Sequence, residues 1–215
     1  MPKETFFNLP EEKRALICRA AVDEFAAHPF EQASINRIVA RSGIAKGSFY
    51  QYFEDKSDLF LYLLQRIADE KLKFLSPVLR NPEQLDLFTL LRELSRSGIE
   101  FAMARPKYAQ ISTNLLAAKG TPIYKQFSER TAPSGAEFFE ALLKNAVAKD
   151  EVRADIDIAM LAHVITSMYT AVTERHLERV SPDYCEKMME TIDRFLDVLK
   201  HGIVAKSVLE RSDPP

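Results

Sequence analysis

The chain has 215 residues, of which 47% are hydrophobic and only 6 are glycine, so its composition favours a helical protein with a sizeable core over a turn-rich β protein. Its net charge of −2 is not that of a generally basic nucleic-acid binder. No uncharged apolar run is long enough to span a membrane, and residues 1–7 lack the apolar stretch of a signal peptide. Cys18 and Cys185 lie far apart and predict no disulfide framework, so we expect a cytoplasmic protein with no membrane partner.

The first sixty residues predict three helices. Apolar residues at inward spacings indicate a first helix at about residues 11–28. A second helix is expected over residues 35–42, with Ser34 placed to cap its first turn through the side chain. Gly43 follows that helix, at a position where left-handed backbone is common. A third helix is expected over residues 46–52.

Two short helices joined by a tight glycine turn are typical of a helix-turn-helix, whose second helix enters the DNA major groove. Residues 34–51 contain three cations, Arg37, Arg41 and Lys46, and no acidic residue. The expected DNA face is therefore positive, although the first 60 residues together hold 8 cations and 9 acids. We expect modest non-specific affinity and a real dependence on base contacts.

The rest of the chain predicts a larger helical region without strands. Further helices are expected at about residues 57–75, 84–104, 105–118 and 136–149. Ser76-Pro77 and Asn81-Pro82 predict a boundary or a bend.

The last two long helices, expected at about residues 156–179 and 183–206, carry broad apolar stripes. Ser181-Pro182 joins them by a short turn, so they should lie antiparallel. Such wide apolar faces are buried either within one chain or, as we favour, partly against a second copy. The residues assigned to this dimer interface are Leu161, Val164, Ile165, Met168, Val172, Met188, Ile192, Phe195, Leu196 and Leu199.

Residues 34–59 resemble the DNA-binding domain of TetR-type bacterial transcriptional regulators. The matching positions are Ser34, Ile38, Ala40, Ser42-Gly43-Ile44, Gly47-Ser48-Phe49-Tyr50, Tyr52-Phe53 and Lys56-Ser57-Asp58-Leu59. His28-Pro29-Phe30 departs from the pattern, which more often has a glycine before the aromatic residue. A proline ends a helix equally well.

The resemblance implies an all-α fold in two parts. Residues 1–56 would form a three-helix helix-turn-helix DNA-binding domain, and residues 57–215 a larger helical ligand-binding and dimerisation domain. It also implies a homodimer that binds a palindromic operator in double-stranded DNA, most often as a repressor. A small effector bound in the second domain would release the operator.

Nine residues are candidate DNA contacts, although each could also be an ordinary structural or solvated residue. Lysine pairs with guanine and glutamine with adenine, so the candidates for base edges are Lys46, Ser48 and Gln51. The candidates for phosphates are Ser34, Arg37, Tyr50, Tyr52 and Lys56. Gly47 would let the backbone approach the DNA closely.

Aromatic and soft side chains of the later helices can line a pocket for a largely apolar effector, or can equally be plain core. The candidates are Phe101, Tyr108, Asn114, Tyr124, Phe127, Phe138, Met168, Tyr169 and Thr173.

No pattern in the sequence indicates catalysis, a metal site or a cofactor. The four histidines lack metal-ligand spacing, and neither GxSxG nor GxGxxG occurs. We therefore expect a protein that is not an enzyme. The alternative is a helical dimer that binds a small molecule or a partner protein and whose helix-turn-helix does not read DNA, which the near-neutral charge of the first 60 residues favours.

Overall fold

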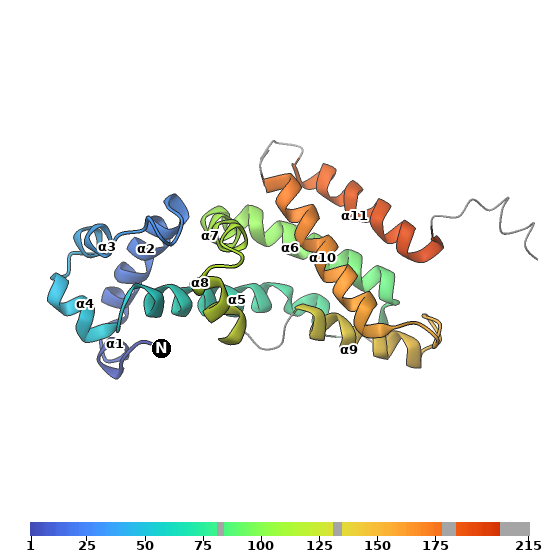
Figure 1. The fold of residues 1–215 in the computed structure, drawn as a ribbon, viewed down its shortest axis with the longest axis horizontal. Helices are drawn as coiled ribbons and strands as arrows, with labels where there is room; N and C mark the ends of the chain where they lie inside the picture. Colours follow the sequence, from blue (N-terminus) through green and yellow to red (C-terminus); the bar gives the residue numbers. More distant parts are fainter. Residues whose placement is uncertain (81–83, 131–134, 178–183, 203–215) are drawn as a thin grey trace, which may run out of the picture. The chain divides into compact units, whose positions relative to one another are not determined.

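The computed structural model describes residues 1–80, 84–130, 135–177 and 184–202, except for the side chains of residues 135, 170, 172–177 and 184–185. Within these ranges the chain forms helices and no strand, which confirms the predicted all-α class (Figure 1). The helices are α1 (Glu4–Phe7), α2 (Glu11–Ala27), α3 (Ile35–Ser42), α4 (Lys46–Tyr52), α5 (Lys56–Leu79), α6 (Leu87–Ala104), α7 (Pro106–Ala117), α8 (Pro122–Arg130), α9 (Gly135–Ala148), α10 (Ile158–Leu177) and α11 (Tyr184–His201). None of them is both long and apolar enough to cross a membrane.

The chain divides into two compact units. Unit 1 comprises residues 1–77 and 100–135, and unit 2 comprises residues 78–99 and 136–215. The predicted boundary after residue 56 differs from this division, because most of α5, together with α7 and α8, packs in the same unit as the helix-turn-helix. A functional boundary at residue 56 stays a prediction.

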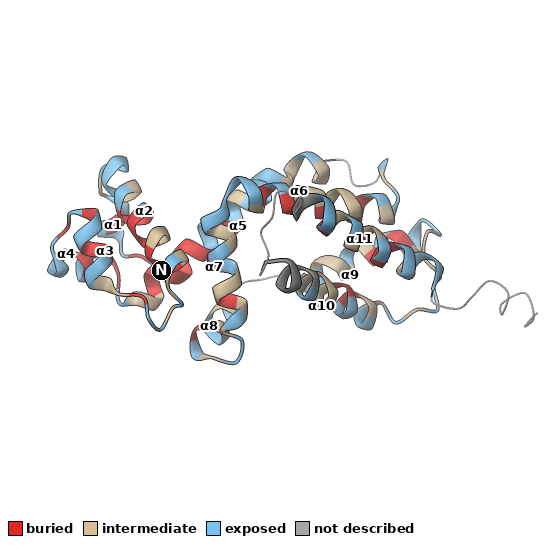
Figure 2. Ribbon diagram, turned by 90° about the horizontal axis from the view of Figure 1, so that it is seen from above, coloured by how far each residue is buried: buried red, intermediate tan, exposed pale blue. Residues whose placement is uncertain are grey.

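Unit 1 is built around one continuous hydrophobic cluster. Phe6, Phe25, Phe49 and Phe53 are at most 1% exposed, and they join α1, α2 and α4 to α5 (Figure 2). The ring centroids of Phe25 and Phe60 lie 4.7 Å apart, which ties the end of α2 to α5. Burying a side chain of this size stabilises the fold by about 1.5–3 kcal/mol. These contacts hold α1 and α4, which are too short to be stable alone.

Unit 2 buries the apolar faces of α6, α9, α10 and α11 against one another. Arg92 of α6 forms two hydrogen bonds to the Asp193 carboxylate of α11, at 2.7 and 3.1 Å. The Tyr169 ring of α10 stacks on Phe139 of α9 with centroids 5.4 Å apart, and its hydroxyl lies 2.6 Å from Ser95 Oγ. Unit 2 thus has its own core.

Much of the predicted dimer interface lies in this core. Five of the ten residues are at most 9% exposed within the single chain, namely Ile165, Met188, Ile192, Phe195 and Leu196. Three others, Leu161, Met168 and Leu199, are partly buried against the same cluster. Val164 is 39% exposed, and the Val172 side chain lies outside the described residues. The apolar stripes therefore pack largely against their own chain.

Helix bounds were predicted well except near residue 76. The α5 helix continues through Pro77 to Leu79 and so extends past its predicted end at about residue 75, whereas the boundary predicted at residues 76–77 coincides with the division between the two units after Pro77. Pro77 lies in the last turn, where the loss of one backbone N–H disturbs few helical hydrogen bonds. The 81–82 pair, and the predicted extensions of the last two helices into residues 178–183 and 203–206, lie outside the described residues. The short helix α1 was not predicted.

Gly43→Ala should lower the free energy of unfolding by about 1 kcal/mol, because φ at Gly43 is +67° and a Cβ disfavours left-handed backbone. Urea unfolding followed by circular dichroism measures the loss. Gly98→Ala in α6 is the control, since φ there is not positive and a Cβ would meet nothing within 4 Å. Equal effects of the two substitutions would contradict the conformational argument.

Candidate DNA-binding interface

The helix-turn-helix consists of α3, a three-residue turn and α4. The turn starts at Gly43 in left-handed backbone, as predicted, and the N–H groups of Gly43 and Ile44 both donate to Val39 O. Ile38 and Phe49 are fully buried, so each short helix is anchored through one face. The opposite faces are left exposed to solvent.

Ser34 occupies the predicted N-cap position of α3, but its side chain makes no capping hydrogen bond. Its backbone N–H instead donates to Glu24 Oε1 over 2.8 Å. The predicted side-chain cap was therefore wrong: the free amide bound at this end is the N–H of Ser34 itself, and its acceptor is the Glu24 carboxylate of α2 and not the Ser34 hydroxyl.

Glu24 is fully buried and binds the start of α3 to α2. The Arg37 Nε donates to both of its oxygens, at 2.8 and 3.0 Å, and Nη2 lies 2.5 Å from Oε1. Burial acts to raise the pKa of Glu24, but the hydrogen bonds from Arg37 and the Ser34 N–H outweigh it, so the pKa lies below its usual range. A buried charge is tolerated here because it is paired and hydrogen-bonded.

Arg37 uses two of its three nitrogens within the protein. Besides binding Glu24, its Nη2 donates to Gln32 O over 2.8 Å. Its side chain is 45% exposed, so the outer part of the guanidinium remains accessible. Arg41 is exposed too, with Nη1 3.8 Å from Glu24 Oε2.

The Lys56 ammonium binds the loop that precedes α3. Its Nζ donates to the carbonyl oxygens of Phe30, Ala33 and Glu31, at 2.6, 2.9 and 3.2 Å, and lies 4.5 Å from the Phe30 ring centroid. An ammonium has three donors, so all of them have acceptors in the protein. Burial lowers the pKa of Lys56. The contacts favour a structural role for Lys56 over the predicted phosphate contact.

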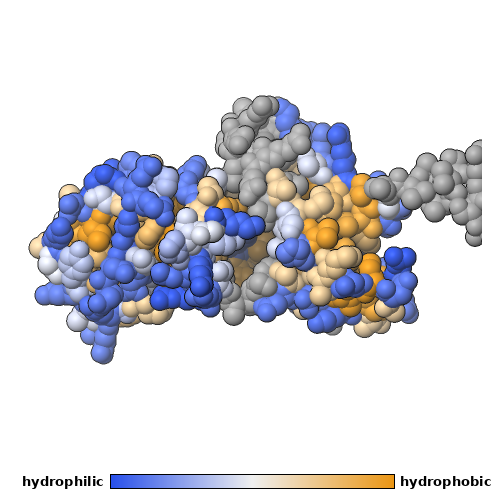
Figure 3. All heavy atoms as spheres, in the orientation of Figure 1, coloured by the Kyte–Doolittle hydropathy of each residue, from blue (hydrophilic) through white to orange (hydrophobic). Residues whose placement is uncertain are grey.

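The outward face of α4 carries most of the predicted DNA contacts. Lys46, Gly47, Tyr50 and Gln51 are exposed, and Ser48 is partly exposed. In Figure 3, hydrophilic side chains cover most of the visible surface over α2, α3 and α4. Tyr52 is different, because it is only 7% exposed and packs near Phe6.

A Cβ on Gly47 would meet no atom of the protein within 4 Å, and its φ is not positive. Neither packing nor backbone conformation therefore requires glycine at this exposed helical position. Glycine in a helix costs about 0.5–1 kcal/mol relative to alanine. Its presence at the start of α4 fits a surface that another molecule approaches closely.

The predicted ligand-pocket residues do not form one group. Phe101, Tyr108, Asn114, Tyr124 and Phe127 belong to unit 1, Phe138, Met168 and Tyr169 belong to unit 2, and the Thr173 side chain lies outside the described residues. Asn114 has a structural partner, since its Nδ2 donates to Phe25 O over 3.1 Å.

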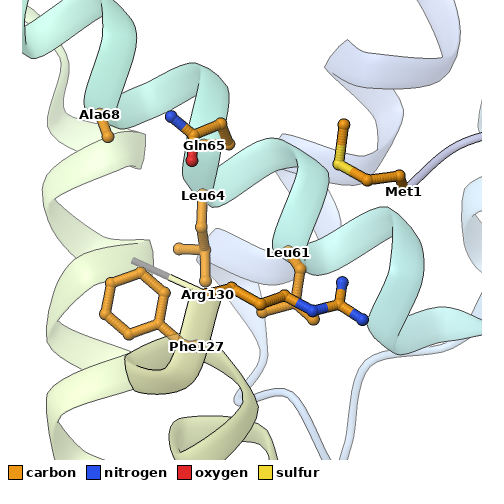
Figure 4. A pocket seen from close by; sticks show the side chains of 7 residues that line it. All are labelled: Met1, Leu61, Leu64, Gln65, Ala68, Phe127 and Arg130. Atoms are coloured by element: carbon orange, nitrogen blue, oxygen red, sulfur yellow. The ribbon is translucent and has the colours of Figure 1, made fainter. Parts of the chain in front are cut away.

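Unit 1 contains a cavity of about 380 Å³ between α5 and α8 (Figure 4). Its lining residues are Met1, Leu61, Leu64, Gln65, Ala68, Phe127 and Arg130. Only Phe127 of these was predicted, because leucines at helical spacing on α5 are indistinguishable in sequence from ordinary core. A second, smaller cavity of about 290 Å³, between α2, α5 and α7, includes Tyr108.

Residues 17–63 match the family model of the bacterial regulatory proteins of the tetR family. A TetR family transcriptional regulator from Chloroflexus aurantiacus J-10-FL is 34% identical over 94% of this chain and 98% of its own, with a TM-score of 0.68. The chain belongs to the TetR family.

Other known proteins are similar to a part of the sequence or to the fold alone. An HTH-type transcriptional regulator of Staphylococcus aureus (strain USA300) is 41% identical over 59 residues, which are 27% of this chain and about a third (32%) of that protein. The regulator FadR from Bacillus subtilis, solved in complex with stearoyl-CoA, is 15% identical over 88% of this chain and 99% of its own, with a TM-score of 0.67. These relatives are regulators of transcription, in agreement with the prediction that the chain is not an enzyme.

Glu24→Gln should lower the free energy of unfolding by about 1–3 kcal/mol at pH 7, because it removes the charged acceptor of the hydrogen bonds from the Ser34 N–H and from Arg37 Nε. Since the pKa of Glu24 is lowered by folding, this stability is complete above the unfolded pKa of about 4.3 and is lost as the pH falls below it. Urea unfolding at pH 7 and pH 3.5 should therefore show a difference between wild type and variant that shrinks in acid. Glu12→Gln, at an exposed site on α2, is the control.

A difference between wild type and Glu24→Gln that stays constant over this pH range would contradict the assignment of the lowered pKa to Glu24.

Proposed function

We propose that the protein is a homodimeric transcriptional repressor, which binds a palindromic operator through α4 and is released by a small, largely apolar effector. The observation that carries this proposal is the exposed face of α4, formed by Lys46, Gly47, Ser48, Tyr50 and Gln51. Membership of the TetR family supports it.

Base contacts are proposed for the exposed side chains of α4. Lys46 stands at the first position of the helix, the end from which recognition helices contact base edges. Gln51 has the amide needed for adenine, and Ser48 is the shorter polar residue between them. Gly47 would let the backbone approach the groove without a Cβ in the way.

Phosphate contacts are proposed for Tyr50, which is 45% exposed, and for the free part of Arg37. Ser34 is partly exposed beside them and stays a candidate. The buried position of Tyr52 and the three carbonyl partners of Lys56 argue against direct contact by these two side chains. Their proposed role is to hold α4 and α3 in place.

A homodimer is proposed because one helix-turn-helix reads only a half-site, and a two-fold dimer reads a palindrome. Met160 and Val164 of α10, one turn apart, are 56% and 39% exposed. Figure 3 shows apolar side chains gathered on the visible surface of unit 2. The proposed interface therefore uses the outer face of α10, on which Val164 of the predicted set lies, and not the apolar residues that are buried in the core of the chain.

The cavity between α5 and α8 is the proposed effector site. Its volume of about 380 Å³ lies at the lower end of the range for small-molecule sites. Leu61, Leu64 and Phe127 provide apolar walls, and Gln65 and Arg130 add polar groups (Figure 4). The FadR structure with stearoyl-CoA supports an effector with an apolar part, since a protein of the same fold binds a ligand with an acyl chain.

Gly47→Ala should weaken operator binding at least tenfold while leaving the free energy of unfolding unchanged or up to about 1 kcal/mol higher, because the methyl group meets nothing in the protein. The operator is first selected from genomic fragments by the purified protein, and affinity is then measured by fluorescence anisotropy. Lys46→Ala should also weaken binding, and Gly98→Ala in α6 is the matched control.

If Gly47→Ala and Lys46→Ala both keep full operator affinity, or if no palindrome is selected at low salt, α4 is not the DNA-reading element. The helical binding protein without DNA recognition would then be the better description.

Filling the cavity should remove effector binding and leave operator binding intact. Ala68→Trp places an indole in the cavity, whereas Leu72→Trp changes a 56% exposed position of the same helix. The probe is 1-anilinonaphthalene-8-sulfonate, whose fluorescence rises in apolar sites. The rise is expected for wild type and Leu72→Trp and not for Ala68→Trp, and equal rises in all three proteins would exclude this cavity as the site.

A further inference from the structure

The last turn of α4 has an unusual source of hydrogen-bond donors. The final four carbonyl groups of any α-helix have no partner within the helix. In α4 these belong to Phe49, Tyr50, Gln51 and Tyr52. The Phe53 N–H donates to Phe49 O over 2.9 Å, which leaves three carbonyl groups for other donors.

All three receive hydrogen bonds from the beginning of the chain. The Lys3 N–H donates to Tyr52 O over 2.8 Å, and the Lys3 ammonium donates to Tyr50 O over 3.0 Å. The Thr5 hydroxyl donates to Gln51 O. The positive charge of Lys3 also lies at the negative end of the α4 dipole, where a cation is favourable.

Phe6 fastens this segment to the core of unit 1. Its side chain is fully buried, with ring centroids 4.8 Å from Phe53 and 5.4 Å from Tyr62. A helix of seven residues is unstable on its own, and nearly half of the α4 residues carry a carbonyl that this segment satisfies.

We propose that residues 3–6, called here the capping segment, form a C-terminal cap for α4 and hold it in the position from which it reads DNA. The inference rests on the proposed function, because α4 is taken as the reading helix. Lys3 and Thr5 act through α4 as positioning residues. The capping segment lies before residues 17–63, so it is not part of the region that matches the family model.

Lys3→Pro and Lys3→Ala form the central pair of test variants. Both lack the ammonium, but only Lys3→Pro lacks the N–H that donates to Tyr52 O. The φ of Lys3 is −73°, which a proline ring adopts without strain. Thr5→Val removes the hydroxyl donor at nearly constant shape, and Thr5→Ser keeps it.

We expect Lys3→Pro to bind the selected operator about fivefold more weakly than Lys3→Ala, which is the effect of one hydrogen bond. Without DNA, amide hydrogen exchange of Tyr50, Gln51 and Tyr52 should be faster in Lys3→Pro than in Lys3→Ala, while exchange in α2 is unchanged. Thr5→Val should likewise weaken operator binding and speed α4 exchange relative to wild type. Thr5→Ser, which keeps the hydroxyl, should have the operator affinity and the exchange rates of wild type.

Equal operator affinity and equal α4 exchange for Lys3→Pro and Lys3→Ala would overturn the proposal. A direct contact of Lys3 with phosphate would instead lower the salt dependence of binding by about one ion in both variants, with unchanged exchange, and would also overturn it. The exchange measurement contains no DNA, so it tests the cap independently of the proposed function. If exchange in α4 is faster in Lys3→Pro than in Lys3→Ala but Lys46→Ala keeps full operator affinity, the cap is supported and DNA reading by α4 is refuted.

Discussion

The buried carboxylate of Glu24 is the interaction on which the DNA-binding face depends. It accepts hydrogen bonds from the Ser34 backbone N–H, at the start of α3, and from the Arg37 guanidinium. These bonds fix α3 on α2. The turn at Gly43 then determines where α4 starts relative to α3. Because a buried charge is stable only with its partners in place, small displacements of α3 on α2 carry a large energetic penalty.

Short helices leave a high proportion of their backbone groups without intrahelical partners, and this unit supplies the partners from distant parts of the sequence. Glu24 accepts a hydrogen bond from the backbone N–H at the beginning of α3, and the Lys56 ammonium donates to carbonyl groups of the loop before it. The capping segment serves the end of α4. Tertiary contacts thus stabilise helices that local propensity alone would not form.

The sequence predicted what depends on neighbouring residues. The bounds of α2, α3 and α4 followed within a residue from apolar spacing, Gly43 and Pro29, because these signals act within one turn. It did not predict the roles of Ser34 and Lys56, since their partners lie 10 residues or more away and include backbone atoms, which leave no trace in residue type.

The same limit applies to the later helices. Leu61 and Leu64 are buried in the core of unit 1 and also line a cavity, whereas Ile165 and Leu196 are buried in the core of unit 2, although all four have the same apolar character and helical spacing. The choice between core, cavity and interface is made by what lies opposite a residue. A single sequence specifies the apolar face of a helix and not its partner.

Contacts within unit 1 offer a physical route between the proposed effector site and the DNA-binding face. The cavity lies against α5, and α5 carries Phe60, which packs on Phe25 at the end of α2. The Asn114 amide of α7 donates to Phe25 O, so α7 is bound to the same end of α2. Residues 28–34 follow this end, and this loop, whose carbonyl groups bind the Lys56 ammonium, leads into α3. A ligand that shifts α5 against α8 would therefore act on the anchoring of α2 and α3, and a close-packed core passes on such shifts because it cannot absorb them.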